Sequence, residues 1–286
     1  MAGNGIAGIS WARQHAQAMY RKLSNGAGGV QRVDRGLLPY LNPDHPLLLE
    51  MEGRMPGTYR HSIIVGSLAA IATAHIGGDT DLARAIGYNH DTGKLRDPEL
   101  FGEAKAGDRA SLSAIDTEAK LRTILDHPLA SREYAEDHGL PEEMRVLLPQ
   151  HHGDGFSRVR LSEDLSARLP IGARRYPGPR PATKEIALVM YADCLQACVD
   201  GLMRKTGWPA EPSAEHLRGI VDTIGEELQA ADQLANSTLT GSELNIAAER
   251  FTTWLFRFYH RLDVTGTPQG EGPLNDERLT FPSSRR

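Results

Sequence analysis

The chain has 286 residues, of which 40% are hydrophobic and 24% charged, as is typical of a globular protein with a sizeable core. Its net charge of −5 argues against a general binder of duplex nucleic acid or of membrane surfaces. The most apolar run, residues 62–74, is too short to cross a bilayer. Cys194 and Cys198 have no disulfide-framework or zinc-ribbon spacing, and no signal-peptide pattern is present, so we expect a cytoplasmic protein.

Hydrophobic residues recur with the helical period along most of the chain, and no alternating run indicates a strand. The sequence therefore predicts an all-α protein. The expected helices, in chain order, cover residues 9–23, 57–76, 80–91, 114–126, Pro128 to about Gly139, 141–152, 183–203, 213–235 and 242–262. Pro56 and Gly77 flank the second of these, and Asp79 or Thr80 caps the third.

Three segments between these helices read as connections. The stretch "PYLNPDHPLL" (39–48) is expected to be a connector punctuated by prolines, and residues 92–113 a loop. Residues 153–182 are rich in glycine, proline and arginine and are expected to form a long loop. Loops of that length in compact domains are usually functional or disordered.

Two polar residues interrupt apolar helix faces. In the helix predicted over 57–76, His61 lies one turn before an apolar stripe that continues from Ile64. In the helix predicted over 183–203, Asp193 falls in the middle of such a stripe. An unpaired carboxylate in a core is very costly, so Asp193 needs a metal ion or a strong donor such as a buried arginine.

Other histidines stand beside residues that could also bind a metal. His90 precedes Asp91 in "HDTGK", His151 precedes His152 in "PQHHGDG", and His127 precedes a proline. Each alone could be a surface or hydrogen-bonded core residue. Together with His61 and Asp193 they make a set of imidazoles and carboxylates that suits Fe, Mn, Zn or Ni. Seven groups exceed what one ion uses, and one bridging carboxylate would let them serve two ions.

The order and spacing of these residues resemble the HD-domain metal-dependent phosphohydrolase superfamily. The likeness is strongest to the HD domain of the seven-transmembrane-HD receptors, the PgpH-type cyclic di-AMP phosphodiesterases. Five segments carry it: "HPLLLEMEGRMPGTYRHS" (45–62), "HDTGK" (90–94), "LDHPLASREYAEDHGLP" (125–141), "QHHGDG" (150–155) and "ALVMYADCLQA" (187–197).

The resemblance implies a helical bundle around a dinuclear metal site. One ion, Fe or Mn in the first instance, would be held by His61, His90, Asp91 and Asp193. Asp91 would bridge to a second ion, whose other ligands are His127, His151 and His152.

The resemblance also divides the chain. We expect an HD phosphohydrolase domain over 40–205, with a helical extension over 1–39 before it. Two C-terminal helices within 206–263 would pack on this domain, and residues 264–286 would form a disordered tail.

The chemistry implied is attack of a metal-bridging hydroxide on phosphorus, with Asp91 and Lys94 as catalytic residues. Lys94 is equally open to interpretation as a cation at a helix end or as a phosphate contact. Arg158 and Arg160 in the 153–182 loop could touch the substrate, or simply face solvent. The expected substrate is a cyclic or short linear dinucleotide, with cyclic di-AMP the leading candidate.

Two other functions fit the same residues. A di-iron oxygenase of the HD type, acting on a phosphonate or a polyol, would use a similar ligand set, but those relatives lack the His-His doublet. A catalytically inactive nucleotide-binding sensor is the second alternative, and the complete set of seven ligands argues against it.

Overall fold

The computed structural model describes residues 3–24, 36–102, 114–203 and 212–261. Over these residues the chain is helical, with two isolated β-bridges and no strand, so the predicted all-α class is confirmed. The α-helices are α1 (Gly3–Ser24), α2 (Pro46–Arg54), α3 (Pro56–His75), α4 (Thr80–Asn89), α5 (Glu118–Asp137), α6 (Glu142–Leu147), α7 (Glu163–Arg168), α8 (Lys184–Met203), α9 (Ala214–Ala230) and α10 (Gly241–Arg261). Short 3₁₀ helices are η1 (Leu38–Leu41), η2 (Thr92–Arg96), η3 (Pro98–Phe101), η4 (Leu148–Gln150) and η5 (Ile171–Arg174).

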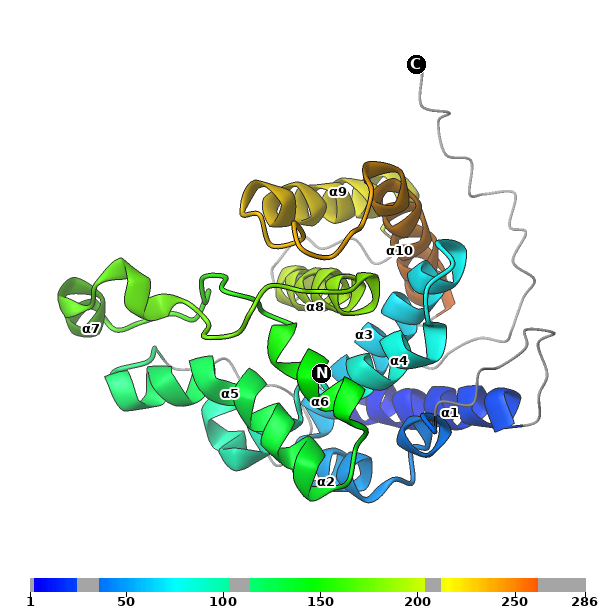
Figure 1. Cartoon of the computed structure of the whole chain (residues 1–286), viewed down its shortest axis with the longest axis horizontal. Coiled ribbons are helices and arrows are strands. Elements are labelled where there is room, and N and C mark those ends of the chain that lie inside the picture. The colour runs from blue at the N-terminus through cyan, green and yellow to red at the C-terminus, as the bar shows by residue number, and fades with distance from the viewer. Residues whose placement is uncertain (1–2, 25–35, 103–113, 204–211, 262–286) are drawn as a thin grey trace, which may run out of the picture.

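Helix α3 is the centre of the fold, and it packs against α1, α2, α4, α8 and α10 (Figure 1). Most of its side chains are buried on every face, as its almost uninterrupted apolar sequence requires. Pro56 occupies the first turn, where a missing amide hydrogen costs nothing. Gly77, in the left-handed region at φ +74°, turns the chain away after the last helical residue.

A glycine-to-glycine crossing brings α3 and α4 together. A Cβ at Gly87 would lie only 2.7 Å from the backbone nitrogen of Gly66, so the two helix backbones touch at this point. The Asp79 side chain accepts a hydrogen bond from the Leu82 amide at 3.0 Å and caps α4 at its start. The crossing allows His61 on α3 and His90 at the end of α4 to reach the same interior region.

All three predicted connections contain helices, and the first two lie in the N-terminal half of the chain. The segment 39–48 includes η1 and the start of α2, whose first residue is Pro46. Because proline is favourable at the first helical position, the prolines that suggested a break begin helices instead. The loop expected over 92–113 contains η2 and η3, and its residues 103–113 lie outside the described part of the chain.

The prediction of two helices separated at Pro128 is wrong, because α5 runs through this proline. Proline inside a helix removes one backbone hydrogen bond, here the bond that would reach the carbonyl of Ile124. The loop expected over 153–182 contains α7 and η5. Together they form an arm that projects from the body of the protein (Figure 1).

Helices α9 and α10 pack against each other as a hairpin. Within the fold, α9 packs on α8 and α10 packs on α3. They correspond to the helices predicted over 213–235 and 242–262. The domain boundaries drawn from the resemblance stay a prediction, and the tail predicted over 264–286 lies outside the described residues.

One described helix, α8, is long and apolar enough to cross a membrane by length and composition alone. Its most apolar 18-residue window has a mean hydropathy of 1.5, and 61% of that window is buried inside the protein. Its contacts with α3, α4 and α9 account for this burial, so its apolar surface serves as core.

Candidate metal centre

The seven residues proposed as ligands converge in the interior although they come from five separate segments. His61 projects from α3, and His90 and Asp91 stand at the junction of α4 and η2. His127 lies on α5, the His151–His152 doublet follows η4, and Asp193 lies on α8. All are buried except His152, which is partly exposed.

Asp91 stands between two groups of these side chains. Its Oδ2 lies 3.4 Å from His90 Nε2 and 3.8 Å from His61 Nε2. Asp193 Oδ1 belongs to the same group, at 2.9 Å from His61 Nε2 and 3.7 Å from His90 Nε2. We call His61, His90, Asp91 and Asp193 the first half of the site. Four potential ligands, two imidazoles and two carboxylates, therefore surround one small volume.

The other oxygen of Asp91 faces the second half of the site, which consists of His127, His151 and His152. Its Oδ1 lies 3.2 Å from His127 Nε2 and 3.8 Å from His151 Nε2. The ligand atoms of His127, His151 and His152 all lie within 4.8 Å of one another. His152 also reaches the first half, since its Nδ1 is 3.5 Å from Asp193 Oδ2. This arrangement suits a carboxylate that bridges two ions through different oxygens.

Backbone carbonyls orient three of the imidazoles. The Nδ1 atoms of His90, His127 and His151 lie 2.8, 2.6 and 2.8 Å from the carbonyl oxygens of residues 87, 124 and 148. In the neutral ring each Nδ1–H donates there, which leaves the Nε2 of that ring unprotonated and aimed inward. For His127 the acceptor is the carbonyl of Ile124, which Pro128 has deprived of its helical partner. The "HP" dipeptide thus sets both the ring and its tautomer.

The fit of cations to this site rests on unpaired polar atoms. His127 Nε2 and His151 Nε2 are 3.2 Å apart, and with both Nδ1 atoms donating to carbonyls, neither Nε2 carries a proton for the other. Two lone pairs facing each other in a buried site require a positive charge between them. His90 Nε2 and Asp91 Oδ1 are also buried without a hydrogen-bond partner. These donor types match divalent transition metals.

Burial and the neighbouring charges shift the pKa values of these groups in different directions. Burial and the other histidines hold the pKa of His151 well below its usual value, and burial lowers the pKa of His152 to about 3. Burial disfavours the charged form of His90, but Asp91 and Asp193 outweigh it and raise its pKa to about 10. Burial likewise opposes ionisation of Asp91, yet His90 and Lys94 keep the pKa of this carboxyl well below its usual range. A metal cation between these groups would replace the proton on His90.

Gly93 and Ser131 join the "HDTGK" turn to α5. Ser131 Oγ lies 2.6 Å from the carbonyl oxygen of His90, to which it donates, and accepts the amide hydrogen of Gly93 at 2.9 Å. A Cβ at Gly93 would collide with the carbonyl of His127 and the amide of Ser131. The glycine is therefore required because the η2 backbone lies directly against α5.

We expect Gly93→Ala to destabilise the protein by about 1–3 kcal/mol, because a methyl group would have to push η2 away from α5. At about 2–4 °C per kcal/mol, the melting temperature should fall by several degrees in a thermal unfolding scan. Gly53→Ala on α2 is the matched control, because a Cβ there meets nothing within 4 Å. Equal melting temperatures of the two variants would contradict the close packing of η2 on α5.

Lys94 is buried and forms an ion pair with Asp91 Oδ2. Its Nζ also lies 5.6 Å from the centre of the Phe101 ring. The side chain therefore points into the candidate metal centre and not along a helix end toward solvent. The catalytic role predicted for Lys94 and Asp91 stays a prediction.

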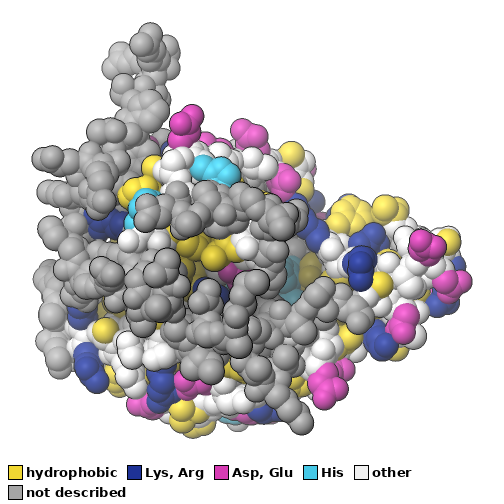
Figure 2. Space-filling model, turned by 180° about the vertical axis from the view of Figure 1, so that it is seen from behind, with side chains coloured by type: hydrophobic (Ala, Val, Ile, Leu, Met, Phe, Trp, Pro, Cys, Tyr) yellow, Lys and Arg dark blue, Asp and Glu magenta, His cyan; other side chains and the backbone are white. Residues whose placement is uncertain are grey.

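Three of the six arginines in the arm that follows the doublet form ion pairs with described acidic side chains. Arg158, whose side chain is 76% exposed, forms an ion pair with Glu227 on α9 at 2.5 Å. Arg160 is exposed, and no described acidic side chain pairs with it. Neither makes a hydrogen bond with the described residues of the metal cluster, so their substrate contacts stay a prediction. The arm carries both basic and acidic side chains on the face shown in Figure 2.

Two aromatic residues beside the ligands were not singled out from the sequence. Tyr176, from the arm, stacks on the His152 ring with centroids 4.2 Å apart and an interplanar angle of 27°. Phe101, from η3, makes a T-shaped contact with the His127 ring, with the ring centroids 5.6 Å apart. Both rings shield the second half of the site. Phe101 follows the "HDTGK" motif closely enough in the chain to have been considered, whereas nothing in the sequence near Tyr176 indicates its position.

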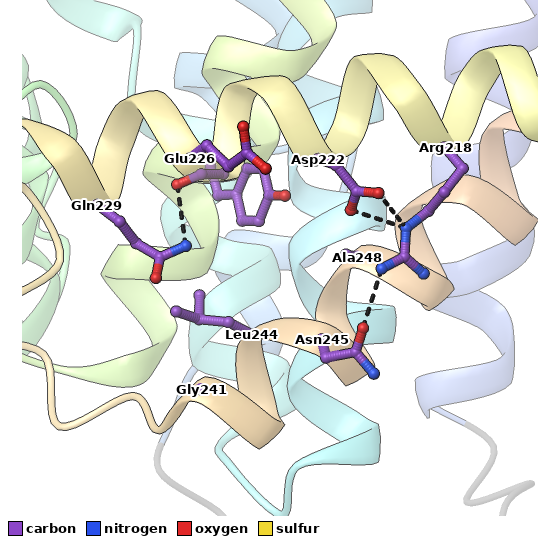
Figure 3. A pocket seen from close by; sticks show the side chains of 10 residues that line it. Arg218, Asp222, Glu226, Gln229, Gly241, Leu244, Asn245 and Ala248 are labelled. Atoms are coloured by element: carbon purple, nitrogen blue, oxygen red, sulfur yellow. Dashed lines mark hydrogen bonds and ion pairs between the residues drawn. The ribbon is translucent and has the colours of Figure 1, made fainter. Parts of the chain in front are cut away.

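A separate hollow of about 260 Å³ lies between α8, α9 and α10 (Figure 3). Its charged groups are largely satisfied within the protein, since Arg218 binds Asp222 at 2.7 Å and Asn245 at 2.9 Å. None of the seven candidate ligands lines it. Among the described residues, the chemistry therefore concentrates at the histidine–aspartate cluster.

Comparison with known proteins agrees with this site. The profile of the HD domain family matches residues 58–198. The chain is 27% identical over 226 residues to the cyclic-di-AMP phosphodiesterase PgpH of Bacillus subtilis, covering 78% of this chain and 31% of PgpH. The PgpH of Listeria monocytogenes is 27% identical over 227 residues, with 79% and 31% covered. The chain thus spans about a third of the length of the curated relatives it matches.

A solved structure shares the fold. The crystal structure of the L. monocytogenes PgpH HD domain in complex with cyclic-di-AMP matches with a TM-score of 0.65 and 27% identity, over 75% of this chain and 98% of that one. The matched region contains all seven convergent side chains, and the family profile ends five residues after Asp193. Residues 58–198 therefore form an HD domain, and the chain is homologous to the PgpH phosphodiesterases.

Proposed function

We propose that this protein is a metal-dependent phosphodiesterase that hydrolyses a cyclic or short linear dinucleotide, with cyclic di-AMP as the leading substrate. The observation that carries the proposal is the position of Asp91, whose two oxygens face two separate groups of ligands. A phosphodiester suits such a centre because its anionic oxygens can bridge two cations. The cyclic-di-AMP in the related PgpH structure supports the choice of nucleotide.

Two divalent ions in the site would supply Lewis acidity toward the phosphoryl oxygens and lower the pKa of a shared water. We propose Fe or Mn, which accept mixed imidazole and carboxylate ligands. The protein orients the imidazole ligands. The Nδ1–H groups of His90, His127 and His151 donate to backbone carbonyls, so the Nε2 lone pairs of these rings point into the site. Lys94 brings a buried positive charge to Asp91 Oδ2, where it can stabilise charge that develops on a phosphoryl oxygen.

We also propose a cytoplasmic enzyme with a small phosphate-containing partner. Cys194 and Cys198 are not joined by a disulfide bond, which suits a reducing compartment. The net charge of −5 supports a small substrate, bound at a local cationic site, over a duplex nucleic acid.

Turnover of a nucleotide panel tests the proposal. Protein loaded with Mn²⁺ or Fe²⁺ would be incubated with cyclic di-AMP, cyclic di-GMP, linear pApA and AMP, and the products separated by chromatography. We expect hydrolysis of at least one dinucleotide, fastest for cyclic di-AMP. His151→Ala should be slower by about a hundredfold or more, equivalent to about 2.7 kcal/mol of transition-state stabilisation. His75→Ala is the control, because His75 is exposed and bonded to its own helix at Ile71.

Three results would contradict the proposal in different ways. Turnover of AMP alone would exclude a phosphodiesterase. Oxygen consumption by the Fe²⁺-loaded protein with a phosphonate or polyol would favour the oxygenase alternative. Binding of a dinucleotide without turnover by fully metallated protein would favour the inactive sensor.

A further inference from the structure

Two segments distant in the sequence pack against the turn that contains and follows the His151–His152 doublet. On one side Gly178 lies so close to the carbonyl of Pro149 that no Cβ would fit between them. Nearby, the amide of Ala182 donates to Gln150 Oε1 at 2.8 Å. On the other side lies the connector between α9 and α10. The doublet therefore depends on two distant segments for its position, besides its own helix.

Asp154, two residues after His152, is the centre of these contacts. Its carboxylate accepts hydrogen bonds from Arg180 Nε at 3.0 Å and Arg180 Nη2 at 3.3 Å. It also accepts one from Gln233 Nε2 at 2.7 Å. Arg180 Nη1 in turn donates to the carbonyl of Asp232 at 3.1 Å. The three side chains are thus linked to one another and to the end of α9.

The end of α9 aims Gln233 at this turn. Asp232 adopts φ +54°, the left-handed conformation that usually falls to glycine or asparagine after a helix. The amide of Gln233 then donates to the carbonyl of Leu228 at 2.9 Å, as in a Schellman motif. The Gln233 side chain is only 4% exposed. Its Nε2 also donates to the carbonyl of Ala231 at 3.3 Å, which helps to keep the amide nitrogen turned toward Asp154.

Gly153 completes the contact. It adopts φ +53°, and a Cβ on it would collide with Gln233 Oε1. Gln233 therefore rests against the backbone of the residue that directly follows the doublet. The ligands of the first half of the metal centre, on α3, α4 and α8, have no hydrogen bond to Asp154, Arg180 or Gln233 among the described residues.

We propose that Asp154, Arg180 and Gln233 form a clamp that positions the His151–His152 doublet and so sets the affinity of the second half of the metal centre. The inference rests on the proposed two-ion site and assigns a role in it to the α9–α10 hairpin. The three residues are positioning residues, because they act through the two histidines and touch neither ion nor substrate.

Titration of the metal-free protein with Mn²⁺ tests the clamp. Calorimetry and the electron paramagnetic resonance signal of the free ion both measure how much Mn²⁺ is bound and how tightly. In Gln233→Ala, and more so in Gln233→Glu, whose carboxylate would face that of Asp154, we expect one of two ions to bind about 10–100-fold more weakly. The other ion should keep its affinity. Gln229→Ala is the matched control, because Gln229 lies one turn earlier and bonds only the carbonyl of Gly225.

A double variant that exchanges the two side-chain types distinguishes a positioning role from a simple loss of packing. In Asp154→Asn combined with Gln233→Glu, the amide and the carboxylate exchange places, so their hydrogen bond can form again. The double variant should bind the second ion more tightly than Gln233→Glu alone. Absence of any rescue, together with equal weakening of both ions, would assign the two residues a general role in stability and overturn the clamp.

A metal-free measurement supplies an independent readout. Amide hydrogen exchange within 149–155 should be faster in Gln233→Ala than in wild type, while exchange within 90–94 stays the same. Unchanged exchange and unchanged affinity for both ions would overturn the clamp and leave the proposed function intact. If wild type itself binds fewer than two ions, it is the two-ion site that fails, and unchanged exchange within 149–155 would then still overturn the clamp.

Discussion

Replacing Asp91 by Ala is expected to remove both ions and to slow phosphodiester hydrolysis by at least about a thousandfold, or about 4 kcal/mol of transition-state stabilisation. The reason is geometric: Oδ2 faces His61 and His90, whereas Oδ1 faces His127 and His151. Loss of this one carboxylate therefore takes a ligand from each half. Elemental analysis of the purified variant measures the metal content, and the nucleotide assay measures the rate.

Controls must separate ion loss from unfolding, because the truncation leaves Lys94 buried without its partner. Asp91→Asn keeps the volume and part of the polarity, and its circular dichroism shows whether the helices are intact. Asp116→Ala removes a carboxylate from a surface pair with Lys120 at 2.8 Å and should leave metal content and rate unchanged. Full metal content in Asp91→Ala would exclude a bridging role.

Chelation of the wild-type protein is expected to lower its melting temperature by roughly 10–20 °C. An ion present at a hundred times its dissociation constant stabilises the folded state by about 2.7 kcal/mol, and two such ions by about twice that. Each kcal/mol shifts the melting temperature of a chain of this size by about 2–4 °C. Calorimetry with and without a chelator, with metal content determined in parallel, measures the shift.

The Asp91→Ala variant is the control for this experiment as well. Having no bridging carboxylate, it should melt at the same temperature with and without chelator. An unchanged melting curve of wild type, with complete metal loss confirmed, would be incompatible with ions bound at a buried centre.

The convergence of the seven candidate ligands could be predicted from the sequence because each conflicts with its surroundings or repeats a known order. His61 and Asp193 interrupt apolar helix faces, and a buried carboxylate demands a partner. The doublets "HD" and "HH" are short, yet together with His127 they follow the order of the HD family. The convergence of the seven side chains agrees with that prediction.

What lies around the ligands could not be predicted in the same way. Pro128 suggested a helix end, because local propensity cannot reveal that a side chain, His127, takes the carbonyl it leaves free. Tyr176 and Gln233 reach the site from segments whose own patterns give no sign of it. Such contacts depend on how the arm and the C-terminal hairpin fold back, which is a property of the whole chain.

The hydrogen bond between His61 and Asp193 joins residues 132 positions apart. Ribosomes add about 5–20 residues per second, so roughly 7–26 s separate the appearance of these two side chains. During that interval the growing chain acquires His127, His151 and His152, which complete the second half of the candidate metal centre, while the first half still lacks Asp193. The first half of the candidate centre can therefore form only after α8 has been synthesised, so an ion held there could not act as a template for the earlier helices.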